Sequence, residues 1–259
     1  MKKKIAVAVS IISLALLTGC ASVPDNSGSN PKDPLETLNR QTFAFNSVLD
    51  EAIFIPIAKG YRFVTPEPVR QSVTNFYHNL REPTNAVNNV LQGKVEDGIL
   101  SLFRLMINST VGVAGLFDVA SKVDIEPKRE DFGQTMGVWG IPSGPYLVLP
   151  IFGPSDIRDA VGLVPEYFMD PNTYTQKDWI KWPVWGVEFV NARERLLPFT
   201  DMLSMTVDPY IAARDAYLSQ RQAAIQDGDM PEILKPEEKL LDPFEDDEAE
   251  AKKPAKEGK

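Results

Sequence analysis

Residue types that commonly carry out catalysis are scarce in this sequence. His78 is the one histidine and Cys20 the one cysteine, so neither a Cys–His pair nor a His/Cys metal site is available. In Gly140-Ile141-Pro142-Ser143-Gly144 the serine stands one position later than in the Gly-x-Ser-x-Gly nucleophile elbow. Neither a phosphate-binding loop nor a dinucleotide fingerprint occurs. We therefore expect no catalytic residue, no metal ligand and no cofactor, and a structural role for His78.

Cys20 is the exception, because its surroundings predict covalent attachment of lipid. A lysine-rich start and an apolar run from Ile5 to Leu17 form a segment too short to span a bilayer, which is typical of a signal peptide. The following Leu17-Thr18-Gly19-Cys20 resembles the lipobox of bacterial lipoproteins. We expect residues 1–19 to be removed and Cys20 to be acylated with more than one chain, as stable anchoring requires. By resemblance to lipoprotein sorting, Ala21 at the next position favours the outer membrane.

Composition divides the rest of the chain into three parts. Residues 20–32 are rich in Ser, Asn, Gly, Pro and Asp and predict a flexible, lipidated tether. Residues 227–259 are acidic and predict a disordered tail, which either improves solubility or docks to a partner. Residues 33–226 have ample length for a single domain. With a net charge of −9, the chain is a poor candidate for nucleic-acid binding. The part after Cys20 has no run of 18 apolar residues, which excludes a conventional transmembrane helix.

Cap residues and apolar spacing predict a mostly helical domain. Asp33 and Pro34 are typical of a helix start, and Glu82-Pro83 predicts an interruption. Gly93 predicts a C-terminal cap. The predicted helices cover 33–50, 65–82, 84–92, a segment with an apolar face from Val95 to Met106, a segment capped by Ser155-Asp156 through Gly162, and a final helix starting at Asp208-Pro209.

Two apolar regions allow more than one interpretation. The segment 108–154 is rich in Gly and Pro, which excludes one long helix and favours short helices and turns. Its glycines permit close approach either within a packed core or against a ligand. Trp179, Trp182 and Trp185 fit a membrane interface, where such rings are enriched, and fit core packing nearly as well.

Ordered sequence blocks across about residues 33–220 carry a resemblance to a known family. The clearest blocks are Asp33-Pro34-Leu35-Glu36, Asn39-Arg40, Asn75-Phe76, Asn79-Leu80, Leu91-Gln92-Gly93, Asn108-Ser109-Thr110, Gly115-Leu116-Phe117-Asp118, Glu130-Asp131-Phe132-Gly133-Gln134-Thr135, Gly144-Pro145-Tyr146-Leu147-Val148-Leu149-Pro150, Gly153-Pro154-Ser155 and Asp208-Pro209-Tyr210. In their order and density they resemble the MlaA (VacJ) lipoproteins.

This resemblance implies a ring-like arrangement of amphipathic helices around a central channel, with an irregular Gly/Pro-rich middle segment. It further implies a lipid-anchored protein at the periplasmic face of the outer membrane. Such a protein removes mislocalised phospholipid from the outer leaflet and passes it to a soluble periplasmic carrier of the MlaC type, which maintains lipid asymmetry. Trimeric porins are the implied protein partners, and no bond is broken.

Irregular backbone at membrane depth survives only inside protein or beside a water-filled cavity. We therefore predict that about Asn108 to Pro150 lines the channel, and that a bulky residue at Gly112 or Gly144 disturbs lipid traffic without affecting export. The candidate channel-lining residues are Gly112, Gly115, Phe117, Phe132, Gly133, Gly137, Gly140, Gly144 and Tyr146. A porin-binding scaffold lipoprotein is the first alternative function, and a lipid-modifying enzyme is the second.

Overall fold

The computed structural model describes residues 30–227, which are mostly helical as predicted. The predicted signal peptide, the lipid anchor Cys20, most of the tether and nearly all of the acidic tail lie outside these residues. The elements are α2 (Glu36–Leu49), a π-helical turn η1 (Asp50–Phe54), α3 (Ile55–Val64), α4 (Glu67–Leu91), α5 (Val95–Thr110), η2 (Ser121–Val123), α6 (Phe132–Val138), β1 (Tyr146–Leu149), β2 (Gly153–Asp156), α7 (Ile157–Met169), η3 (Pro171–Tyr174), α8 (Asp178–Arg195), α9 (Leu197–Ser204) and α10 (Pro209–Ile225).

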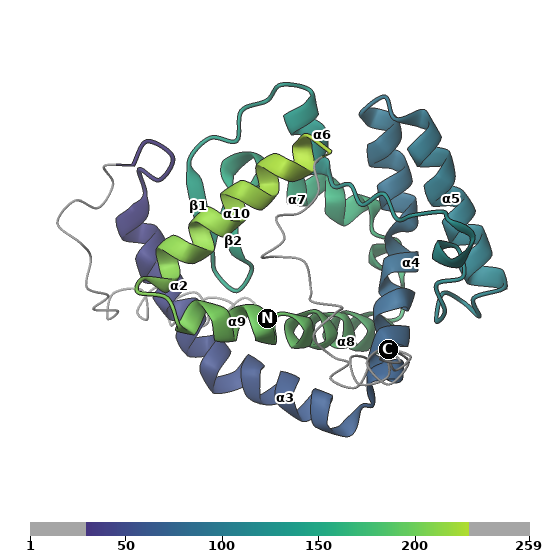
Figure 1. Ribbon diagram of the computed structural model, residues 1–259, viewed down its shortest axis with the longest axis horizontal. Coiled ribbons are helices and arrows are strands. Elements are labelled where there is room, and N and C mark those ends of the chain that lie inside the picture. The colour runs from purple at the N-terminus through teal and green to yellow at the C-terminus, as the bar shows by residue number, and fades with distance from the viewer. Residues whose placement is uncertain (1–29, 228–259) are drawn as a thin grey trace, which may run out of the picture.

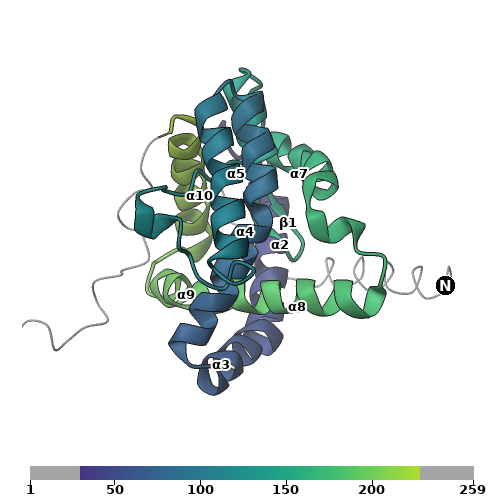
Figure 2. The ribbon, with the colours of Figure 1, turned by 90° about the vertical axis from the view of Figure 1, so that its right-hand side faces the viewer.

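The helices are arranged as a ring (Figure 1). α2 and α3 form one side and the lower edge, α4 and α5 form the opposite side, and α6 and α7 lie at the top. α8 and α9 run above α3, and α10 returns from α9 to α6. Contacts of α8 with both α3 and α4 close the lower corner. Figure 2 shows α4 and α5 packed side by side as an antiparallel hairpin.

α4 is one helix of 25 residues, so the predicted interruption at Glu82-Pro83 is wrong. Proline removes one backbone donor and disfavours a helix interior, but packing can override this local cost. Here α4 lies along α5, and Glu82, beside the proline, forms an ion pair with Arg104 of α5 at 2.8 Å. The helix ends as predicted at Gly93, whose φ is +84°. The amide of Lys94 bonds to the carbonyl of Asn89 in a Schellman arrangement.

The start of α2 differs from the predicted cap. Leu35 is the N-cap residue, while the side chain of Asp33 is fully buried. Asp33 accepts hydrogen bonds from Asn39, from the hydroxyl of Tyr210, and from Arg214 at 3.1 Å. The carboxylate therefore ties α2 to α10 instead of capping a helix, because α10 supplies a cation and a hydroxyl. Beyond α2 the chain stays helical through η1, since Pro56 stands in the first turn of α3.

The Gly/Pro-rich middle contains the short helices η2 and α6, as predicted, and a β-hairpin, which was not predicted. α6 begins with a capping box in which Asp131 and Gln134 satisfy each other's backbone amides. β1 and β2 pair antiparallel, with Tyr146 opposite Asp156 and Leu149 opposite Gly153. Tyr146 and Val148 of β1 pack with Tyr210 of α10 in the buried apolar core. The hairpin thus joins the middle segment to α10.

Candidate functional site

Two adjoining cavities of different polarity lie within the ring. The polar cavity has a volume of about 400 Å³ and collects side chains of α4, the segment before α6, α8 and α10. The apolar cavity, of about 1130 Å³, is lined by aromatic and aliphatic residues of α2, η1, the β-hairpin and α7 to α10. Arg81, Thr84, Glu166 and Glu188 line both cavities. A molecule with a polar and an apolar end can therefore occupy both across this shared boundary.

The β-hairpin loop contributes to the wall of the apolar cavity. Asn46 of α2 fixes this loop by donating to the carbonyl of Leu149 at 2.9 Å and accepting from the amide of Ile151 at 2.8 Å. Phe152 at the tip is 78% exposed and lines the cavity. An exposed phenylalanine held against an apolar space is suited to contact acyl chains.

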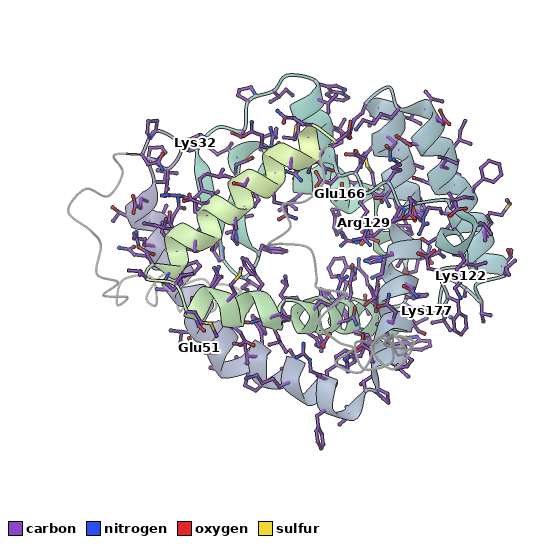
Figure 3. All side chains as sticks on the ribbon, viewed as in Figure 1. Lys32, Glu51, Lys122, Arg129, Glu166 and Lys177 are labelled. Carbon is purple, nitrogen blue, oxygen red and sulfur yellow. The ribbon has the colours of Figure 1, made fainter. Side chains whose placement is uncertain are left out.

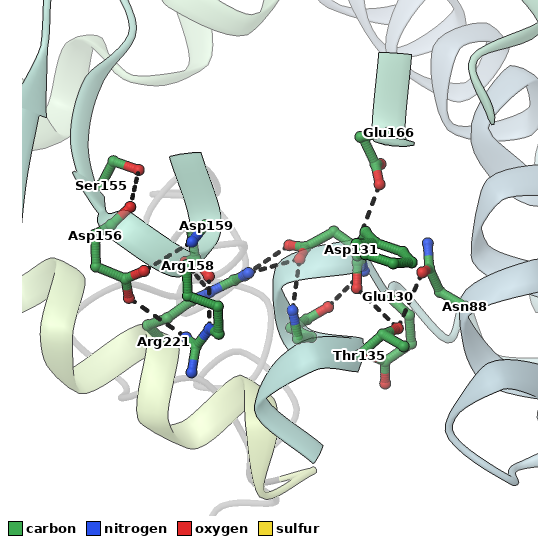
Figure 4. Close-up of polar contacts among 12 residues, drawn as sticks. Asn88, Glu130, Asp131, Thr135, Ser155, Asp156, Arg158, Asp159, Glu166 and Arg221 are labelled. Carbon is green, nitrogen blue, oxygen red and sulfur yellow. Dashed lines mark hydrogen bonds and ion pairs between the residues drawn. The ribbon is translucent and has the colours of Figure 1, made fainter. Parts of the chain in front are cut away.

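Ionic contacts hold the elements around the polar cavity together (Figure 4). Arg221 of α10 makes two hydrogen bonds of 2.6 Å to Asp131, the N-cap of α6, and also pairs with Asp159 of α7. Burial would raise the pKa of Asp131, but the hydrogen bonds and charge of Arg221 outweigh it and hold this pKa below its usual value. Tyr217 donates to Asp159 at 2.6 Å. Arg221 thus links three elements in one wall.

His78 lies between two arginines in the polar cavity. Arg129 Nη2 is 3.1 Å from His78 Nδ1, and Arg195 Nη1 is 3.4 Å from Nε2. Burial, followed by the charges of Arg129, Arg195 and Arg81, lowers the pKa of His78 to about 3, so the ring is neutral at pH 7. Figure 3 shows Arg129 and Glu166 on the inner side of the ring, whereas Lys122 lies at its outer edge.

The surroundings of His78 do not resemble a catalytic base. Its ring contacts two guanidinium groups, whereas a general base in a triad is oriented by an acceptor such as a carboxylate. Within residues 30–227, no group of three or more His, Cys, Asp or Glu side chains is arranged to hold a metal ion.

The nine predicted channel-lining residues line neither cavity. Gly112 and Gly115 belong to the tight turn after α5, where a Cβ on Gly112 would lie 2.2 Å from the carbonyl oxygen of Phe117. Gly115 has φ +86° and approaches the side chain of Asn79. Phe117 itself is 55% exposed. Here the glycines serve close packing, one of the two possibilities that the sequence left open.

The remaining predicted residues are also explained by packing and turns. Gly133 lets α6 approach α7 and α10, because a Cβ there would lie 2.4 Å from both Arg221 and Asp159. Gly137 faces Ile225 and Arg158 in the same way, and Phe132 contacts Trp139 edge to face. Gly140 and Gly144 adopt positive φ in the loop before β1, and Tyr146 is buried in the core. The nine named residues therefore support the cavity walls from outside, whereas Arg129, Glu130 and Asp131 of the same predicted segment line the polar cavity.

The residues that do line the apolar cavity were not identified from the sequence. They include Phe43, Phe54, Leu163, Phe189 and Phe199, from five different helical elements. Their only signal was apolar spacing on helices, which is equally typical of core residues. Trp185, from the predicted tryptophan cluster, also lines this cavity, while Trp179 and Trp182 are 73% and 61% exposed. Core packing therefore does not account for the latter two.

Comparison with known proteins identifies the family. A family model described as MlaA lipoprotein matches residues 31–224. The chain belongs to the MlaA lipoprotein family. It is 35% identical to the intermembrane phospholipid transport system lipoprotein MlaA of Escherichia coli over 88% of this chain and 90% of that protein. The Haemophilus influenzae MlaA is 32% identical over 90% and 94% of the two chains. An uncharacterized Rickettsia prowazekii protein is 41% identical over 75% and 78%.

A solved structure supports the same assignment. One chain from work on the structural basis for maintenance of bacterial outer membrane lipid asymmetry matches with a TM-score of 0.66 and 34% identity. The match covers 74% of this chain and 98% of that one. Within residues 30–227, no helix of this MlaA family member has the length and apolar character needed to cross a bilayer.

Proposed function

We propose that this MlaA family member removes mislocalised phospholipid from the outer leaflet of the outer membrane and passes it to a soluble periplasmic carrier. Transfer of this kind maintains lipid asymmetry. The supporting observation is the pair of adjoining cavities, one polar and one apolar, which match the two ends of a phospholipid. The names of the Escherichia coli and Haemophilus influenzae relatives agree with this substrate.

The energetic role of the apolar cavity follows from the cost of exposing acyl chains. Each CH₂ group moved from lipid into water costs about 0.8 kcal/mol, so two chains cannot cross an aqueous gap unprotected. An apolar cavity of about 1130 Å³ covers part of the chains while the headgroup occupies the polar cavity. The protein thereby lowers the barrier without catalysing a reaction. In this proposal an energy source elsewhere in the envelope drives the direction of transfer.

The location in the proposal is the periplasmic face of the outer membrane, with Cys20 as the lipid anchor. Large apolar side chains that are half exposed or more on the helices support contact with lipid. They include Val95, Leu102 and Met106 on α5, Val161, Val164 and Phe168 on α7, and Trp179 and Trp182 on α8. In the same proposal, a trimeric porin and an MlaC-like carrier are the protein partners.

The test is surface labelling of outer-leaflet phospholipid in cells that lack this protein. We expect the labelled phospholipid to increase on deletion and to return to the wild-type level with the intact gene. A Cys20→Ser variant, unable to carry lipid, should fail to restore it. An unchanged outer leaflet on deletion would contradict lipid removal and favour the porin-binding scaffold. Porin pull-down would then be the deciding measurement.

A further inference from the structure

The contacts of His78 leave hydrogen-bond donors in excess. Arg129 and Arg195 approach the two nitrogens of the ring at 3.1 and 3.4 Å. A guanidinium group only donates, and a neutral imidazole has a single accepting nitrogen. The ring can therefore accept from one of the two arginines but not from both. The second guanidinium therefore keeps donors that can bind another acceptor in the cavity.

Neither arginine forms an ion pair within the described part of the chain. Among residues 30–227, no carboxylate oxygen lies within 4.0 Å of a nitrogen of Arg129 or Arg195. Five acidic residues of the described chain line the same cavity, and four of them are paired with other cations: Glu82 with Arg104, Glu130 with Lys94, Asp131 with Arg221 and Glu188 with Arg81. The fifth, Glu166, accepts a hydrogen bond from the backbone amide of Phe132 at 3.2 Å. Within the described residues, Arg129 and Arg195 thus face the polar cavity without an ion-pair partner.

The surroundings of both arginines disfavour their charged forms. Burial, and then the repulsion between like charges, lowers the pKa of Arg129 below its usual value. Burial lowers the pKa of Arg195; the charge of Glu194 opposes this shift, and the charge of Arg81 adds to it. Both side chains are accessible to solvent, because they face the cavity. An anion can therefore reach them and would relieve the repulsion.

We propose that His78, Arg129 and Arg195 form a binding site for the phosphodiester of a phospholipid headgroup. The guanidinium groups of Arg129 and Arg195 donate to its non-bridging oxygens, a geometry for which arginine is well suited. His78 is a positioning residue that holds one of the two guanidinium groups by accepting its hydrogen bond. This site rests on the proposed function and names the part of the lipid that the polar cavity recognises.

The adjoining apolar cavity favours a lipid over free phosphate. The polar cavity that contains the cluster meets the apolar cavity at Arg81, Thr84, Glu166 and Glu188. A headgroup bound to the cluster can therefore extend its acyl chains across this boundary. Inorganic phosphate would use the arginines alone and leave about 1130 Å³ of apolar space without a role.

The test compares two lipids that share the same acyl chains and differ in the presence of a phosphoglycerol headgroup. The full chain in detergent is titrated with dioleoyl phosphatidylglycerol and with dioleoylglycerol, and binding is measured by native mass spectrometry. We expect Arg129→Gln and Arg195→Gln each to weaken phosphatidylglycerol binding about tenfold, since a charge-assisted hydrogen bond is lost. Dioleoylglycerol binding should stay within about twofold. His78→Gln should reduce the preference for phosphatidylglycerol over dioleoylglycerol.

Two kinds of control separate the site from general effects of charge and folding. The double variant Lys59→Gln/Lys122→Gln removes two positive charges from residues that line neither cavity, and should bind both lipids as the wild type does. Arg129→Lys and Arg195→Lys keep the charge and should retain more phosphatidylglycerol binding than the Gln variants. Thermal unfolding of each variant, followed by circular dichroism, identifies any that is misfolded.

The outcomes distinguish this site from the proposed function. Wild-type binding of phosphatidylglycerol that both Gln variants retain would refute the site alone, as would equal losses for the two lipids. Inorganic phosphate is added as a competitor. If it binds through the arginines while phosphatidylglycerol binding does not depend on them, the site serves a free anion and the proposal is wrong. If the wild type binds neither lipid, the proposed function fails as well.

Discussion

Replacing Arg104 by alanine should strongly destabilise the helical hairpin of α4 and α5. The side chains of Arg104 and Glu82 are 3% and 2% exposed, and their ion pair measures 2.8 Å. Arg104 also bonds to both carboxylate oxygens of Asp118 at 3.1 Å. Its loss would leave Glu82 buried, with Asn85 as its remaining hydrogen-bond partner in the described chain. Breaking a buried pair in this way costs about 3–5 kcal/mol.

The size of the effect follows from the length of the domain. For a domain of about 150–250 residues, 1 kcal/mol shifts the thermal midpoint by about 2–4 °C, so Arg104→Ala should lower it by about 6–20 °C. The measurement is thermal unfolding of the full chain in detergent, followed by far-ultraviolet circular dichroism, which reports helix content. Arg104→Met/Glu82→Gln, which removes both charges, should be closer to the wild type than Arg104→Met alone.

Arg62→Ala is the matched control. Arg62 is 44% exposed, and its partner Glu194 keeps a second cation, Arg70, at 3.3 Å. Exposed pairs contribute about 0–1 kcal/mol, so the midpoint should fall by about 4 °C at most. Equal shifts for Arg62→Ala and Arg104→Ala would refute the reasoning, because they would show that burial of the Arg104 pair has no energetic consequence.

Three further predictions follow from the same structure. Gly112→Ala should destabilise the fold by about 1–3 kcal/mol, because its Cβ would meet backbone oxygen. Gly60→Ala, which has open space around the new Cβ, should stabilise α3 by about 0.5–1 kcal/mol. The thermal midpoints of the two variants test both signs. Ser47→Trp fills part of the apolar cavity, so less phospholipid should copurify with this variant than with Gln71→Trp, because Gln71 lines neither cavity. The lipid is extracted and measured by mass spectrometry, and equal amounts from the two variants would show that the cavity is unused. The pKa of His78 is about 3 in the fold against 6.5 in the unfolded chain, so its contribution to stability is complete above pH 6.5 and is lost as the pH falls towards 3. The thermal midpoint of His78→Gln should therefore fall less steeply than that of the wild type over this pH range. Parallel curves of midpoint against pH would argue against a neutral His78 in the fold.

Local signals in the sequence predicted several helix ends correctly. Asp208 caps α10 by accepting from the amides of Tyr210 and Ile211, and Asp156 caps α7 through the amide of Asp159. Gly93 ends α4. These signals succeed because a cap involves residues within a few positions of one another, so the sequence contains all of its parts.

Signals that depend on a distant partner were misread. Asp33 has the residue type and position of a helix cap, yet its partner Arg214 lies 181 positions away and draws it into the core. The proline inside α4 has the residue type of a helix breaker, yet α5 packs along the helix and holds it together. In both cases tertiary contacts outweigh a local preference of about 1–3 kcal/mol.

The sequence by itself determined the mostly helical class and the family resemblance. Only the tertiary structure decided where the cavities lie and which residues line them. The apolar cavity gathers side chains between Phe43 and Ala213, and the cluster at His78 brings together Arg129 and Arg195 from 51 and 117 positions away. The physical reason is that periodicity and caps are properties of neighbouring residues, whereas a cavity is the space left when distant elements pack around it.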